Sequence, residues 1–168
     1  LDDTITVSGH ISGQGGVRVQ GLGGTVVLTD ATNSFQRGIY VDGNGTLQVA
    51  SIGDIGVNSH AGAGFTGTAI VLGSGTNSGT LEYTGGIGET NRRVQIGDNN
   101  ANPNRAGAGT IKNSGSGTFT FDATNFNVAL GTTTTDRTLT FETDTTNAGG
   151  DIIVSGVIID NNAGATIG

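Results

Sequence analysis

Short runs in which apolar and polar residues alternate recur along the whole chain, and most of them open with the same phrase. A glycine is followed by a threonine and then by apolar residues at every second position, as in Gly-Thr-Leu-Gln-Val at 45–49 and Gly-Thr-Leu-Glu-Tyr at 79–83. Alternation with a period of two predicts β-strands that bury one face. Further copies lie at 24–28, 109–111, 117–121 and 137–141, the last with Arg137 in place of the glycine.

Strand signals are present throughout the chain, whereas no stretch carries apolar residues at helical spacing. The expected strands are short, and clusters of Gly, Asn, Asp and Ser separate them as turns. The sequence therefore predicts an all-β fold. Strands are expected at 4–7, 17–19, 25–28, 39–41, 46–49, 69–72, 81–83, 94–96, 110–111, 118–121, 127–130, 138–141 and 152–154.

Two all-β architectures compete for this pattern. A sandwich favours longer, more uniform strands and often a core Trp, which this chain lacks. A parallel β-helix, or β-solenoid, accommodates short strands, small residues at tight corners, and Thr or Asn stacked from one rung to the next. We therefore predict a parallel β-helix, and at roughly 20–25 residues per rung the chain would form about seven rungs.

The Gly-Thr phrase is unevenly spaced, which bears on how the rungs are built. The steps from Thr25 to Thr46 and from Thr118 to Thr138 fit single rungs. The short step from Thr110 to Thr118 predicts two sides of one rung. The longer steps require a longer rung or an inserted loop.

Composition and charge narrow the function classes. Gly accounts for 32 of 168 residues, Pro occurs once, and only 12% of the residues are charged, about half the usual share. The formal net charge is −7 and Arg92-Arg93 is the only adjacent basic pair, so nucleic acid is not an expected partner. No apolar run approaches the roughly 20 residues of a membrane helix, so no membrane insertion by this segment is expected.

The chain is expected to come from a longer polypeptide. It has no Cys, which excludes disulfides and thiol chemistry, and it has no Met, so Leu1 is not a natural start. The phrase Val-Ser-Gly at 7–9 recurs at 154–156. We expect residues 1–168 to be a single β-solenoid segment of a larger chain, with one large repeat unit at 4–147 and the start of the next at 148–168.

Residues 9–50 carry a specific resemblance. A Gly-rich run from Ile11 to Val17 precedes two strands that open at Gly24-Thr25 and Gly45-Thr46, with a polar turn and an aromatic at 33–35. This order resembles the passenger-associated transport repeat, also called the autotransporter-associated β-strand repeat. The departures are Arg37, where a Thr-Gly-Gly turn is common, and Val26 in place of Leu. The segments 137–140 and 154–158 resemble the spacer that leads into the next repeat.

The resemblance implies a right-handed parallel β-helix in a secreted or surface-anchored bacterial protein. It implies no catalytic residues. In that family the repeat is thought to support export and to stiffen a stalk.

The candidate catalytic and metal residues are few. His10 and His60 are the only histidines; they have no carboxylate at ligand spacing and are interpreted as solvent-facing turn residues, although Asp54 lies six positions before His60. A Ser-His-Asp triad stays open, without the Gly-x-Ser-x-Gly elbow. The polar loop Asp98–Asn104 has the oxygens for Ca²⁺ but one carboxylate, so it is interpreted as a protruding turn.

The acidic and aromatic residues have structural interpretations. Acidic side chains beside turns are expected to cap the backbone, and a glycosidase pair would require two carboxylates from adjacent rungs. The aromatic rings at alternating strand positions are expected to form an inward stack. These acidic residues are Asp2, Asp3, Asp42, Asp122 and Asp136, with Glu82, Glu89 and Glu142 as the only glutamates, and the stacked rings are Phe119, Phe121 and Phe141.

These observations predict a non-enzymatic, structural role on the bacterial cell surface or outside the cell. We expect an elongated stalk, fibre or adhesin spacer that stacks end to end with neighbouring copies, and surface glycans are a further expected partner. We assign no catalytic residue, no metal ligand and no cofactor. The alternative is a carbohydrate-binding or carbohydrate-cleaving β-helix similar to a pectate lyase, whose mark would be clustered Asp and bound Ca²⁺ around Arg92, Arg93 or Arg105.

Overall fold

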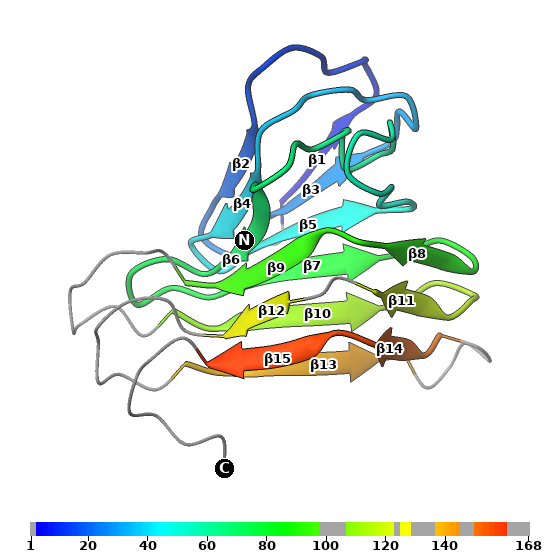
Figure 1. The fold of residues 1–168 in the computed structure, drawn as a ribbon. Coiled ribbons are helices and arrows are strands. Elements are labelled where there is room, and N and C mark those ends of the chain that lie inside the picture. The colour runs from blue at the N-terminus through cyan, green and yellow to red at the C-terminus, as the bar shows by residue number, and fades with distance from the viewer. Residues whose placement is uncertain (1–2, 98–106, 123–124, 129–136, 145–149, 161–168) are drawn as a thin grey trace.

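The computed structural model describes residues 3–97, 107–122, 125–128, 137–144 and 150–160. Within these ranges the chain forms β-strands and no helix, and the strands lie in three sheets (Figure 1). The predicted all-β class is therefore confirmed for the described residues.

The strands form two large sheets and one small sheet, and in all three sheets successive strands follow one another along the same axis. The first large sheet has the order β1-β3-β5-β7-β10-β13, the second has β15-β12-β9-β6-β4-β2, and the small sheet has β14-β11-β8. The first contains β1 (Thr4–Val7), β3 (Thr25–Leu28), β5 (Gly45–Val49), β7 (Gly79–Tyr83), β10 (Gly109–Asn113) and β13 (Leu139–Thr143). The second contains β2 (Val17–Gln20), β4 (Ile39–Asp42), β6 (Ala69–Leu72), β9 (Arg93–Ile96), β12 (Asn125–Val128) and β15 (Val157–Asp160). The small sheet contains β8 (Gly88–Thr90), β11 (Phe119–Phe121) and β14 (Ile152–Val154).

Every pairing between the named strands is parallel. The chain visits the first sheet, then the small sheet where it exists, then the second sheet, and returns to the first one strand further along the stack. This order is consistent with a β-solenoid. Each large sheet has six described strands, while the right-handed winding and the seven rungs stay predictions.

The register of the first sheet explains the Gly-Thr phrase. Thr25 lies opposite Thr46, Thr46 opposite Thr80, and Thr80 opposite Thr110, so the threonines form a row across the sheet. In β5 the burial alternates: Gly45, Leu47 and Val49 are buried and the residues between them are half-buried. The phrase therefore places threonine on the outer face and glycine inside.

The glycine of the phrase is required because the two large sheets approach each other closely there. A Cβ on Gly79 would run into the carbonyl oxygen of Val41, and one on Gly109 would lie 2.5 Å from Cδ1 of Ile96. In β7 and β10 the phrase therefore begins with the residue that fits the corner, whereas in β13 Leu139 lies at the equivalent position.

One detail of the predicted spacing is wrong. The threonine row of the first sheet continues at Thr140, which lies opposite Thr110. Thr118 precedes β11 in the small sheet, so the step from Thr118 to Thr138 joins different sheets and is not one rung. The short step from Thr110 to Thr118 does join two sides of one turn, as predicted.

The structure contains two strands that the alternation did not predict. The strand β8 reads Gly-Glu-Thr and has no apolar pattern of its own; it forms because it lies beside Phe119–Phe121. The strand β15 follows β14 after a bend and pairs with β12. The repeat boundary between 147 and 148 stays a prediction. The recurring phrase itself occupies different sheets, because Val7 ends β1 and Val154 ends β14.

Apolar side chains fill the interior in rows that run along the stack. Phe119 packs its ring against Tyr83 at 4.2 Å between centroids and against Phe121 at 4.8 Å. Phe119 and Phe121 are buried as predicted, whereas Phe141 on the last described strand of its sheet is 40% exposed. The two large sheets contribute the rows Leu47, Leu81, Ile111 and Ile39, Ile70, Val94.

The tight corner generates a stability prediction. Gly79→Ala should lower the free energy of unfolding by about 3 kcal/mol, because the new methyl group meets backbone that cannot rotate away. Gly86→Ala is the matched control, since nothing lies within 4 Å of its added Cβ. Urea denaturation followed by circular dichroism measures both variants, and equal stabilities would contradict the corner packing.

Candidate functional site

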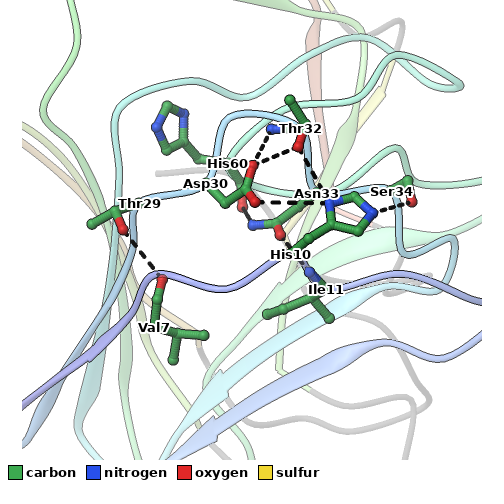
Figure 2. A network of polar contacts seen from close by, with 9 residues as sticks. All are labelled: Val7, His10, Ile11, Thr29, Asp30, Thr32, Asn33, Ser34 and His60. Atoms are coloured by element: carbon green, nitrogen blue, oxygen red, sulfur yellow. Dashed lines mark hydrogen bonds and ion pairs between the residues drawn. The ribbon is translucent and has the colours of Figure 1, made fainter.

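The connecting segments that follow β1, β3 and β5 stack on one another and bring both histidines into one polar cluster (Figure 2). The backbone N–H of Ser34 donates to the carbonyl of Ile11 at 2.9 Å, and that of Ser59 donates to the carbonyl of Asn33 at 3.3 Å. Backbone pairing from turn to turn therefore continues where these segments have no regular strand.

Asn33 lies at the centre of this cluster and is fully buried. Its Oδ1 accepts from the backbone N–H of Ile11 at 2.7 Å, and its Nδ2 donates to the carbonyl of His60 at 3.1 Å. One amide side chain therefore joins three successive turns of the chain.

His10 lies on the exposed side of the cluster. Its Nδ1 is 3.3 Å from Oγ1 of Thr32 and 3.9 Å from Oδ2 of Asp30, and its Nε2 is 3.3 Å from Oγ of Ser34. The hydroxyl and backbone N–H of Thr32 both donate to Asp30, and these bonds, aided by the charges of His10 and His60, hold the pKa of Asp30 below its ordinary value.

The order Ser34, His10, Asp30 is that of a Ser-His-Asp triad, but the geometry favours a structural role. The gap between His10 and Asp30 exceeds a hydrogen bond, and the carboxylate already accepts two bonds from Thr32. The His10 side chain is 45% exposed, so water reaches the ring. The expectation of a solvent-facing turn residue fits His10.

His60 is half-buried and held by its own segment. Its backbone N–H donates to Oγ of Ser51 at 3.2 Å, and the same hydroxyl lies 2.7 Å from Nδ1 of the ring. Asp54 serves a different partner: its Oδ1 accepts from the backbone N–H of Asn91 at 2.8 Å. Asn91 in turn accepts from the backbone N–H of Ile55 at 2.9 Å, so the segment 50–68 is attached to the next turn.

Arg92 is an interior anchor rather than a surface charge. It is 1% exposed, and its Nη1 donates to the carbonyl of Ala61 at 2.7 Å. Burial lowers its pKa to about 10. Its role is to hold the inserted segment 50–68 against the core.

The described acidic residues are dispersed among structural partners. Asp42 is buried and pairs with Arg18 of the neighbouring strand, so it does not cap its own turn. Glu89 and Asp122 are exposed. Clustered Asp of the pectate-lyase kind does not surround Arg92 or Arg93 in the described part of the chain.

Glu82 forms a second polar network on the outer face of the first sheet. Burial raises its pKa, but bonds from Ser114 at 2.7 Å, Lys112 at 3.0 Å and Gln48 at 3.3 Å outweigh it, so the net pKa is lowered. Glu142 lies opposite Lys112 in the register, on the far side from Glu82. The lysine thus separates the two carboxylates.

Several predicted residues lie outside the described ranges. They are Asp2, the loop Asp98–Asn104, Arg105 and Asp136. Among the described residues, no group of three His, Asp or Glu side chains could hold a metal ion.

Sequence reasoning missed the buried amides. Asn113 ends the Gly-Thr strand β10 at the position where the neighbouring strand β7 has Tyr83. Its Nδ2 donates to the carbonyls of Gly117 and Asp151 at 3.0 and 2.9 Å, and its Oδ1 accepts from the N–H of Gly115 at 3.0 Å. A polar residue at an inward position of the alternation is the signal that could have identified it.

Comparison with known proteins gave one informative similarity. The chain is 31% identical over 162 residues to the adhesin BmaC autotransporter of Brucella suis biovar 1 (strain 1330), a match that covers 94% of this chain and 4% of that protein. The similarity supports a relationship to the autotransporters and leaves the specific strand repeat as a prediction. No family model and no solved structure matches the chain. In the described residues there is no helix long and apolar enough to cross a membrane.

The central amide generates the prediction for this site. Asn33→Ala should lower the free energy of unfolding by about 2 kcal/mol, because it removes the partner of the partly buried N–H of Ile11 and of the partly buried carbonyl of His60. Asn58→Ala is the control, since Asn58 is exposed. Chemical denaturation compares the two, and a loss below 0.5 kcal/mol for Asn33→Ala would contradict the bridging role (about the range of an ordinary surface change).

Proposed function

We propose that the chain is a non-enzymatic segment of a right-handed β-helix in the surface-exposed region of an adhesin-like autotransporter. Its role there is mechanical: it extends and stiffens a stalk and spaces other parts of the protein from the cell. The observation that carries the proposal is the unbroken parallel register of the strands, together with the similarity to an autotransporter adhesin.

The open sheet ends support end-to-end stacking. Among the described strands, β1 and β2 each have one neighbour, so within this segment the other edge of each is open to a further strand. Such an edge is a template for another strand. Ile5 and Leu22 are 61% and 94% exposed at this end, so a further turn of a solenoid would cover apolar surface as well as pair backbone groups.

The edge can be blocked at one residue without disturbing the strand within. In β1 the carbonyls of Asp3 and Val7 accept from the N–H groups of Thr25 and Thr29. In a parallel ladder, alternate residues use their backbone groups toward opposite neighbours, so the N–H of Thr6 points to the open edge. Proline is tolerated at such edge positions because it removes only the outward donor.

We therefore predict that the chain self-associates end to end and that Thr6→Pro weakens this association. Small-angle X-ray scattering over a concentration series should show a growing maximum dimension at a constant cross-section for the unmodified chain and for the control Thr6→Val. A chain that stays monomeric at millimolar concentration, or that thickens as it associates, would refute the stacking role.

A further inference from the structure

A positively charged groove lies on the outer face of the second large sheet. It has a volume of about 700 Å³, within the range of ligand-binding clefts. Its lining includes Arg18, Arg37, Arg93, Tyr40, Thr68 and Gln95.

The charge of this groove is opposite to that of the chain. Three of the seven Lys and Arg residues line it, although the formal net charge is −7. Its described lining contains no Asp and no Glu. A concave surface with charges of one sign concentrates ligands of the opposite sign, so the groove favours an anion.

The register of the sheet places the groove across several turns of the chain. Arg18, Tyr40, Val71 and Gln95 lie opposite one another in succession on β2, β4, β6 and β9. At about 4.8 Å between strands, this row extends about 14 Å along the stack. The row thus suits an elongated ligand that lies along the axis of the stack.

The floor and the rim of the groove differ in chemistry. Val71 and Gln95 are each 6% exposed and form a rigid floor, while the ring of Tyr40 is 48% exposed at the rim. Arg93 is half-buried, and its Nε has no hydrogen-bond partner. The site is therefore built on strands and offers both charge and an aromatic face.

Within the described part of the chain, two of the three arginines of the groove have no acidic partner. Arg18 pairs with Asp42, which lies beside the groove. Among the described residues, no carboxylate forms an ion pair with Arg37 or Arg93. Arginine can bind a planar carboxylate or a sulfate through two parallel hydrogen bonds.

We propose that this groove binds an anionic glycan, a sugar chain that carries carboxylate or sulfate groups. Arg37 and Arg93 bind the anionic groups, and the face of Tyr40 packs against a sugar ring. The amide of Gln95 and the hydroxyl of Thr68 line the groove beside them, where they already donate to the carbonyls of Gly97 and Phe65 and so contribute to its shape. The groove would give the stalk a ligand of its own and does not depend on end-to-end stacking.

The lining favours a sugar chain over an acidic peptide. A peptide that adds to a sheet needs an open edge. The strand β2 at one end of the groove has such an edge, but the groove extends from there over the face of β4, β6 and β9, which are paired on both sides. An exposed aromatic ring among polar hydrogen-bonding groups is suited to the apolar face and hydroxyls of a sugar.

Isothermal titration calorimetry of the 168-residue chain tests the proposal with four probes. They are a heparin-derived tetrasaccharide, tetragalacturonate, a neutral cellotetraose and a Glu-rich hexapeptide. We expect binding to at least one anionic sugar, with affinity that falls as salt is added, and no binding to the neutral sugar. The comparison of the first two probes identifies sulfate or carboxylate as the preferred group.

Three variants locate the binding. Arg37→Gln should lower the affinity for the anionic sugar about fivefold, because it removes one exposed charge from the rim of the groove. Tyr40→Ser should lower the affinity for the sugar by a similar factor. The control Lys112→Gln removes one charge from the first large sheet and should leave the affinity within twofold of that of the unmodified chain. Thermal unfolding of each variant verifies that it is folded.

Three outcomes would overturn the proposal. One is no binding of either anionic sugar. Another is an equal loss in Arg37→Gln and Lys112→Gln, which would mean nonspecific charge attraction. The third is a higher affinity for the Glu-rich peptide than for either anionic sugar, with the peptide affinity unchanged in Tyr40→Ser. That result would assign the groove to an acidic protein segment.

Discussion

The parallel backbone ladder is the constraint on which the rest of this structure depends. Because each strand pairs in register with the strand one turn earlier, residues at equivalent positions are stacked about 4.8 Å apart. Threonine therefore lies beside threonine on the outer face of the first sheet, and aliphatic side chains follow one another inside. Residues at equivalent positions of successive turns share the same environment, so the same residue types suit each turn. This accounts for the recurrence of the Gly-Thr phrase.

The segments that follow β1, β3 and β5 contain no regular strand, and side chains provide many of the hydrogen-bond partners that their backbone groups need. Between β1 and β6 the connecting segments would leave backbone groups buried, and a buried polar group without a partner is costly. Asn33 connects three turns there, and Arg92 binds the carbonyl of Ala61 in the longest described insertion. Further along, the small sheet takes over this side, and Asn113 supports its corner. The polar interior thus appears where the ladder is irregular.

Much of the fold could be predicted from the sequence, because the alternation of apolar residues is a local signal. It located the strands of the first sheet, and it placed Thr110 and Thr118 on two different sides of one turn. It could not locate Gly88–Thr90, since that strand depends on its neighbour Phe119–Phe121. It also interpreted the step from Thr118 to Thr138 as one rung, whereas these residues precede strands of different sheets, which only the pairing reveals.

The functional residues were harder to predict, because they are brought together by stacking rather than by spacing. Asp30 is distant from His10 in sequence, yet it lies beside it once the two turns are stacked. Arg18, Arg37 and Arg93 come from different turns, and no motif links them. Asp42 looked like a turn cap, but its carboxylate pairs with an arginine of the neighbouring strand. In a solenoid the neighbour of a residue is set by the length of the intervening turn, which composition does not reveal.

The most direct test of the ladder is disulfide formation between engineered cysteines on the outer threonine row, since the chain has no cysteine of its own. Thr46 and Thr80 lie opposite each other on neighbouring strands, whereas Thr110 lies one strand beyond Thr80. Cysteines at 46 and 80 should cross-link under mild oxidation, and cysteines at 46 and 110 should not, because only the first pair falls within disulfide reach. Efficient cross-linking of the second pair, or none of the first, would contradict the parallel register.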